Sequence, residues 1–218
     1  MSTIRRTAYE MTSEEEINRF MSEMSYGTLA MQGEEWPYAV PINYVYHRNQ
    51  VYLHGSKAGH KMEMIRTSGK VAFSVSKEYA IVPSYFSDPK LACPATAYFK
   101  SVLIRGQAEL VENVEEKAEV LGALMRKLQP EGGYEPIDPA DPDYMPRIRG
   151  VAVLRLAADS LTAKFAFGQH LNEERFERVC GGLEERGTEG DLQTAELMRK
   201  YSGRCPIHEG PAGDGNAS

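Results

Sequence analysis

Residues 52–66, YLHGSKAGHKMEMIR, gather several side chains that could do chemistry at one point of the chain. A strand-like apolar pattern ends at Gly55, and a short helical pattern follows it. The first N–H groups of a helix lack intrahelical acceptors and carry partial positive charge, which favours an anion and most often a phosphate. Lys57 and Lys61 add formal charge, and Ser56 adds a hydroxyl donor. The pattern therefore predicts an anion site at this turn.

The charge around this turn contrasts with that of the whole chain. Four basic residues against Glu63 give the segment from His54 to Lys70 an excess of +3, whereas the chain carries a formal net charge of −6. A lysine-bearing turn before a short helix can equally be a solvated change of direction, and the residues alone leave both interpretations open. The glycine spacing does not match a P-loop or a dinucleotide-binding fingerprint.

Metal and thiol chemistry receive less support from the spacing of candidate ligands. His54 and His60 are six positions apart and have no third ligand nearby, so a metal site is not expected there. Cys205 and His208 have metal-like spacing, but they form a single pair. The three cysteines are widely spaced and odd in number, which excludes a disulfide framework and favours a reducing compartment.

The elements that position the turn are mostly strands. Short segments rich in Val, Tyr, Ile and Phe predict strands at 26–31, 38–47, 51–55, 70–76, 97–111 and 149–169. Capping residues and apolar spacing predict helices at 13–25 and 114–128, and a two-turn helix at 58–66. Prolines predict loops at 80–96 and 129–146, and charged helices are expected after Leu171. Hairpins without regular strand–helix alternation favour a small antiparallel barrel.

The composition restricts the class of protein. A hydrophobic fraction of 42% is sufficient for a folded core, and the acidic balance argues against a nucleic-acid-binding surface. The N-terminal residues lack the apolar segment of a signal peptide, and no stretch reaches the roughly 20 apolar residues of a membrane helix. We therefore expect a cytoplasmic protein that interacts with neither membrane nor nucleic acid.

The motifs together resemble those of flavin-binding split-barrel proteins related to pyridoxamine 5′-phosphate oxidase, in particular the nitroimidazole-resistance (Nim) branch. The resemblance lies in the hairpin motif G-x-L-A…P-Y-x-V-P-I/L-N/S-Y/F at 27–44 and the turn H-x-S/A-x-x-G-x-K at 54–61. It continues in the segments YFKSVLIRGQAELVEN and KFAFGQHLN. This order covers about residues 12–172.

The resemblance implies a fold, a cofactor and a partner. The fold is a mainly β, six-stranded antiparallel Greek-key split barrel with flanking helices and a C-terminal helical extension. The cofactor is FMN, held in a groove between the subunits of a homodimer. The expected barrel domain is 1–172. Outside the resemblance, the composition of the chain predicts a helical extension at 173–204 and a disordered tail at 205–218.

The resemblance also implies cofactor-binding residues. Ser56, Lys57 and Lys61 would hold the phosphate, and the backbone of Val40–Tyr44 with the Asn43 side chain would line the flavin ring. Lys164 and Gln169 would reach the cofactor across the dimer. The full set of implied contacts is Val40, Pro41, Ile42, Asn43, Tyr44, His54, Gly55, Ser56, Lys57, His60, Lys61, Ser101, Lys164 and Gln169.

The implied activity is an FMN-dependent oxidoreductase that moves electrons from NAD(P)H or another donor to a small acceptor such as a nitroaromatic. His54 would polarise the flavin or donate a proton; alternatively, it is a strand-end histidine bonded to a neighbouring carbonyl. Several phosphate-binding arginines of true pyridoxamine phosphate oxidases are absent or displaced, so we do not expect that activity. A non-catalytic FMN protein, a haem-binding split barrel with a histidine ligand and an empty dimeric scaffold remain alternatives.

Overall fold

The computed structural model describes residues 4–203. The chain divides into two compact units. The first contains the described residues up to Lys77 together with Lys100–Lys164, and the second contains Glu78–Phe99 and the described residues from Phe165 onward. Strands β4, β5 and β6 continue from one unit into the other.

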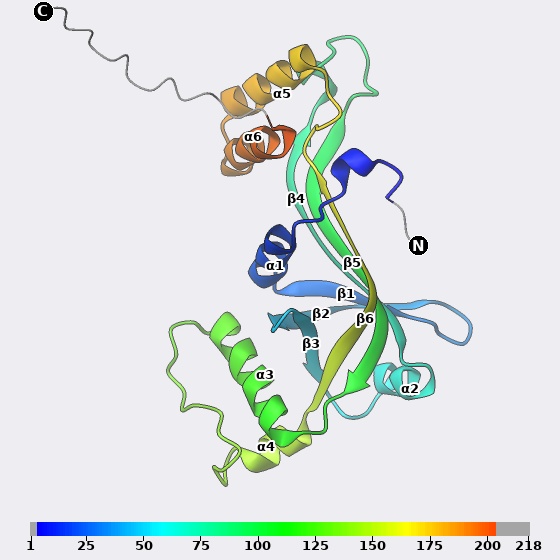
Figure 1. Cartoon of the computed structure of the whole chain (residues 1–218), viewed down its shortest axis with the longest axis vertical. Helices are drawn as coiled ribbons and strands as arrows, with labels where there is room; N and C mark the ends of the chain where they lie inside the picture. Colours follow the sequence, from blue (N-terminus) through cyan, green and yellow to red (C-terminus); the bar gives the residue numbers. More distant parts are fainter. Residues whose placement is uncertain (1–3, 204–218) are drawn as a thin grey trace, which may run out of the picture. The chain divides into compact units, whose positions relative to one another are not determined.

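Six antiparallel strands form a closed barrel, in the order β1-β2-β3-β6-β5-β4 (Figure 1). The first three strands follow one another as hairpins, and β4 returns to pair with β1. This order, 4-1-2-3, is the Greek-key arrangement, as expected from the sequence. The strands are β1 (Tyr26–Met31), β2 (Tyr38–His47), β3 (Gln50–Gly55), β4 (Lys70–Val82), β5 (Thr96–Leu110) and β6 (Ala152–Ala166).

The helices lie outside the strands. In the first unit α3 packs along β2, and in the second unit α5 and α6 pack against each other (Figure 1). Side-chain caps at Ser13, Asn113, Asn172 and Thr188 fix the starts of α1, α3, α5 and α6. The helices are α1 (Glu14–Glu23), α2 (His60–Thr67), α3 (Val114–Leu128), α4 (Met145–Gly150), α5 (Glu173–Arg186) and α6 (Glu189–Ser202), and two 3₁₀ turns are η1 (Thr7–Tyr9) and η2 (Ser84–Phe86).

Three expectations from the sequence were wrong at the ends of elements. The predicted strand 70–76 continues to Val82, because a second group of buried residues, Tyr79, Ala80 and Val82, extends β4 into the segment expected to be a loop. The predicted strand from 149 begins only at Ala152, because α4 precedes it with Pro146 in its first turn. The helix predicted at 58–66 begins at His60. No helix in the described part of the chain is long and apolar enough to cross a membrane.

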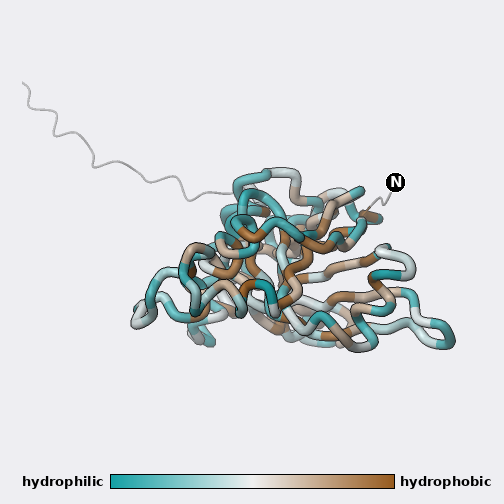
Figure 2. Tube along the Cα trace, turned by 90° about the horizontal axis from the view of Figure 1, so that it is seen from below, coloured by the Kyte–Doolittle hydropathy of each residue, from teal (hydrophilic) through white to brown (hydrophobic). Residues whose placement is uncertain are grey.

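Each unit has an apolar core. The barrel core includes fully buried side chains from all six strands, among them Leu29, Tyr44, Leu53, Phe73, Val102 and Leu154. The second unit buries aromatic and aliphatic side chains from β6, α5 and α6, namely Phe165, Phe167, Phe176, Leu183 and Met198. Apolar positions are concentrated along the strands, and loop tips are hydrophilic (Figure 2). The barrel therefore provides a rigid support for the turn that follows β3.

Candidate anion and cofactor site

The turn between β3 and α2 leaves backbone donors open. Gly59 caps α2 with φ 104° and ψ 167°, a region that only glycine adopts readily, and no side chain caps the helix. Within the described residues, the N–H groups of Gly59, His60 and Lys61 donate to no protein acceptor. The next two N–H groups of the helix both donate to the Gly59 carbonyl. The start of α2 therefore presents unpaired donors, as the sequence predicted.

Two further contacts fix the shape of this turn. The Ser56 Oγ accepts a hydrogen bond of 3.1 Å from the Ala58 N–H, which leaves the hydroxyl proton of Ser56 available to a ligand. The guanidinium of Arg66, in the last turn of α2, donates to the Lys57 carbonyl at 2.8 Å and so fixes the backbone of the β3–α2 turn. The side chains of Ser56 and Lys57 are exposed.

Lys61 is the more enclosed of the two lysines. A Cβ atom built on Gly55 would lie 3.2 Å from the Lys61 ammonium nitrogen, so that nitrogen lies directly against the end of β3. Burial lowers the pKa of Lys61 below its ordinary value, because a partly desolvated ammonium is less favourable. No ion pair of Lys61 occurs among the described residues, so its charge is available to an anion.

His54 lies half-buried at the end of β3 next to this charge. Its Nδ1 is buried and has no hydrogen-bond partner among the described residues, whereas Nε2 is not buried. The alternative of a strand-end histidine bonded to a neighbouring carbonyl is therefore not what the structure shows. Burial first, and then the positive charge of Lys61, lower the pKa of His54. An unpaired buried nitrogen costs about 1–3 kcal/mol, so Nδ1 of His54 does not contribute to stability at this position.

The register of the barrel brings the predicted β2 edge next to His54. Tyr44 pairs with Leu53, and the next residues outward on the two strands are Asn43 and His54. Asn43 is half-buried and donates weakly to the Ser25 carbonyl at 3.5 Å. The Tyr44 side chain, by contrast, is in the barrel core and donates to the Met21 carbonyl at 2.7 Å. The Tyr44 backbone N–H donates to the Ser25 carbonyl at 3.1 Å, so a role for Tyr44 at a cofactor stays a prediction.

The remaining β2 positions and His60 lie at or near the surface. Val40 and Ile42 are half-buried and Pro41 is exposed, which fits an accessible strand edge. His60 is exposed and packs edge-on against the Tyr38 ring, with 5.3 Å between the ring centroids. The turn and this edge of β2 thus form one accessible region of the first unit.

Comparison with known proteins places this region in a family. Residues 13–165 match the family described as pyridoxamine 5′-phosphate oxidase. The chain belongs to the pyridoxamine 5′-phosphate oxidase family. No curated protein matches the chain.

Several solved structures share the fold of this chain. A candidate 5-nitroimidazole antibiotic resistance protein from Bacteroides thetaiotaomicron has a TM-score of 0.56 and 25% identity, over 71% of this chain and 85% of that one. The flavocytochrome Anf3 from Azotobacter vinelandii has a TM-score of 0.65 and 22% identity, over 80% and 78% of the two chains. An FAD- and haem-binding protein from Mycobacterium smegmatis has a TM-score of 0.60 and 17% identity, over 72% and 73%.

Three further predicted contacts, Ser101, Lys164 and Gln169, lie on β5, on β6 and just after β6. Ser101 is half-buried on β5. The Lys164 backbone forms an isolated antiparallel bridge with Glu10, and the Lys164 ammonium lies over the Tyr9 ring, 5.5 Å from its centroid. Lys164 is also 11 residues beyond Val153, the residue opposite His54, which corresponds to about 36 Å of extended strand. Lys164 therefore lies far along β6 from the residue that is opposite His54, and its role at the cofactor stays a prediction.

Gln169 belongs to the second unit and uses its side chain locally. Its Nε2 donates to the Phe165 carbonyl at 2.6 Å, and its Oε1 accepts from the Phe167 N–H at 2.8 Å. The amide therefore closes a short turn after β6. The possible zinc ligands Cys205 and His208 lie outside the described residues, and within those residues no group of three potential ligands could hold a metal.

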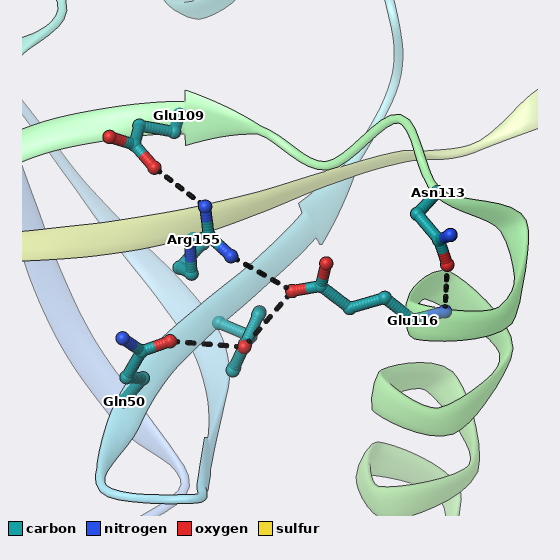
Figure 3. Close-up of polar contacts among 6 residues, drawn as sticks. Gln50, Glu109, Asn113, Glu116 and Arg155 are labelled. Carbon is teal, nitrogen blue, oxygen red and sulfur yellow. Dashed lines mark hydrogen bonds and ion pairs between the residues drawn. The ribbon is translucent and has the colours of Figure 1, made fainter.

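The sequence did not predict a polar pocket of about 370 Å³ that lies between α3 and the β2–β3 hairpin. Arg155 pairs with Glu109 at 2.9 Å and with Glu116 at 3.3 Å, and Tyr52 donates to the same Glu116 oxygen at 3.1 Å (Figure 3). Glu119 pairs with both His47 and Arg48. Every charge in the pocket is thus compensated by another, so we assign this network to holding α3 on the barrel. Its members come from five separate elements, β2, β3, β5, β6 and α3, and no local motif could have indicated the pairing.

Proposed function

We propose that this protein is a homodimeric, FMN-dependent oxidoreductase with the flavin bound at the β3–α2 turn and the β2 edge. The observation that carries the proposal is the turn itself: open N–H groups and an unpaired, partly buried Lys61 next to a half-buried histidine, in a member of this family. Unpaired donors and ammonium groups at a helix start are the chemistry that a phosphate monoester requires.

The residues present fit such a cofactor. Ser56, Lys57 and Lys61 would hold the phosphate, with Lys61 contributing most because its ammonium is the least hydrated. The accessible backbone of β2 and the Asn43 side chain would contact the polar edge of the ring. His54 would offer Nε2 to the bound group, while its buried Nδ1 keeps the ring from being a freely solvated base. The neutral imidazole favoured by this environment can donate one hydrogen bond from a ring N–H to the bound group.

A bound flavin would supply the electron transfer, so the chain needs only to bind and orient the reactants and to exclude water. NAD(P)H is the proposed donor and a small nitroaromatic compound the proposed acceptor. The acceptor is suggested by the likeness to the candidate 5-nitroimidazole resistance protein, with 25% identity over 71% of this chain. The displaced arginines noted in the sequence argue against pyridoxamine phosphate as the substrate.

A dimer is part of the proposal because the resemblance to the family implies a flavin held between two subunits. Lys164 and Gln169 would complete the cofactor site from the partner, and Ser101 would add a contact to the phosphate or the ribityl chain. A flavin carrier without turnover and a haem-binding protein are the second candidates. The latter is suggested by two structures of this fold, described as a flavocytochrome and as an FAD- and haem-binding protein.

Reconstitution experiments test the proposal directly. Purified protein should bind FMN stoichiometrically, sediment as a dimer, and consume NADH or NADPH steadily only when an acceptor is added. Flavin binding without turnover would identify a carrier. A strong Soret band with no flavin would instead identify a haem protein, and failure to bind either group would overturn the proposal.

A further inference from the structure

His54 lies beside a positive charge that a bound anion would neutralise. The imidazole is half-buried, and its Nδ1 is covered and has no hydrogen-bond partner among the described residues. The charge belongs to Lys61, which lies against the adjacent Gly55. Both burial and this charge favour the neutral imidazole in the protein alone.

Among the neighbours of His54, Lys61 carries the charge that affects the equilibrium between the neutral and the protonated imidazole. On β6 the residue opposite is Val153, and on β2 the adjacent residue is Asn43, neither of which carries a charge. Among the described residues no carboxylate forms an ion pair with His54. The ammonium of Lys61, on α2, is the charged group that acts on the ring. Any change in the effective charge at Lys61 is therefore transmitted to His54.

We infer that binding of a phosphate monoester at this turn is coupled to uptake of a proton by His54, so that the histidine takes the proton which the phosphate loses. This inference rests on the proposed function, because it places the FMN phosphate at the turn. A phosphate monoester has its second ionisation near pH 6 and binds most strongly as the dianion. A site with lysines alone would therefore lose affinity for FMN as the pH falls below about 6.

The sign of the coupling follows from the geometry. An anion at Lys61 cancels the positive charge that opposes protonation of His54, and protonated His54 adds a positive charge facing the anion. The complex then holds more protons on His54 than the free protein does, so this residue strengthens phosphate binding as the pH falls. For one proton taken up, the gain is at most about tenfold in affinity per pH unit. His54 thereby offsets the loss caused by protonation of the phosphate.

The test compares FMN affinity in wild type, His54→Gln and the control His47→Gln across the range from about pH 5.5 to 8. Glutamine keeps hydrogen-bonding groups but does not titrate, and His47 is a histidine at the end of β2 that pairs with Glu119 outside the candidate site. We expect the ratio of FMN affinity between wild type and His54→Gln to rise as the pH falls, with His47→Gln behaving as wild type. Riboflavin, which lacks the phosphate, should show no such rise. Calorimetry in two buffers of different ionisation enthalpy should show greater proton uptake in wild type than in His54→Gln.

A second measurement uses inorganic phosphate alone and needs no variant. The NMR titration of His54, assigned through backbone-linked spectra, should move to higher pH when phosphate is added to flavin-free protein. FMN binding with an affinity ratio independent of pH, an equal effect with riboflavin, or an unchanged His54 titration with phosphate would each overturn the inference. Absence of any flavin binding would overturn the proposed function instead, and the phosphate titration would still decide the coupling.

Discussion

Replacing Lys61 by methionine isolates the contribution of the charge that the structure places closest to the barrel. Methionine has a similar length and lacks the ammonium, so the packing against Gly55 is largely kept. A charge-assisted hydrogen bond contributes about 1.5–3 kcal/mol, which corresponds to roughly a 10- to 150-fold loss of FMN affinity.

Lys57→Met is the matched comparison, because its side chain is exposed on the same turn. We expect a smaller loss from this variant, under about 1.5 kcal/mol, since solvent screens its interaction with the phosphate. The double variant should lose about 2–5 kcal/mol. The larger effect of Lys61 is the part of this expectation that comes from the structure rather than from the sequence.

The assay is a fluorescence titration with FMN and, in parallel, with riboflavin. If Lys61 holds the phosphate, the variant loses affinity for FMN and keeps its affinity for riboflavin. An equal loss for both ligands would mean that Lys61 supports the fold or the ring instead. FMN affinity unchanged beyond a few-fold in the double variant would refute the placement of the phosphate at this turn.

Two further predictions concern stability. Burial lowers the pKa of Lys127 to about 8, and its ammonium donates to the Met24 carbonyl. The unfolded chain therefore binds more protons between about pH 8 and 10.5, so wild-type stability rises with pH across this window. Because the lysine is only half-buried, we expect the free energy of unfolding of wild type to rise by about 1–2 kcal/mol between the lower and the upper end of this pH window, as measured by urea denaturation. Lys127→Met should lack this rise, and an equal rise in the variant would contradict the assignment. In the second unit, Arg186 lowers the pKa of the buried Asp191 to about 2. Arg186→Met should lower the free energy of unfolding by about 2–3 kcal/mol at neutral pH, because it leaves that carboxylate unpaired. The double variant Arg186→Met, Asp191→Asn should recover part of this stability. If it recovers none, Arg186 acts instead through its hydrogen bond to the Ile81 carbonyl.

The sequence predicted the barrel well because its strands carry local signals. Strands β1 and β2 and helix α3 begin and end at the predicted residues, since polar turns and a cap mark their limits. The six-stranded order was predicted only through the resemblance to a family, because strand pairing between β3 and β6 joins residues about a hundred positions apart. The extension of β4 to Val82 was missed, because its alternation is interrupted by Lys77 and Glu78.

For the candidate site, residue types predicted the turn but not its electrostatics. Spacing indicated Ser56, Lys57 and Lys61 together, and the structure adds that Lys61 is enclosed and Lys57 is exposed. The unpaired Nδ1 of His54 depends on what packs around the ring, which no local pattern encodes. The network around Glu116 and Arg155 was missed for the same reason, because its partners meet only in the folded barrel.

The visible spectrum of the purified protein tests the central claim most directly. We expect the purified protein to show a flavin spectrum, which bleaches when NADH or NADPH is added without oxygen. Denaturation should release the bound flavin, and this flavin should be FMN. A protein that is colourless as purified and remains so after incubation with FMN and removal of the excess would contradict the claim.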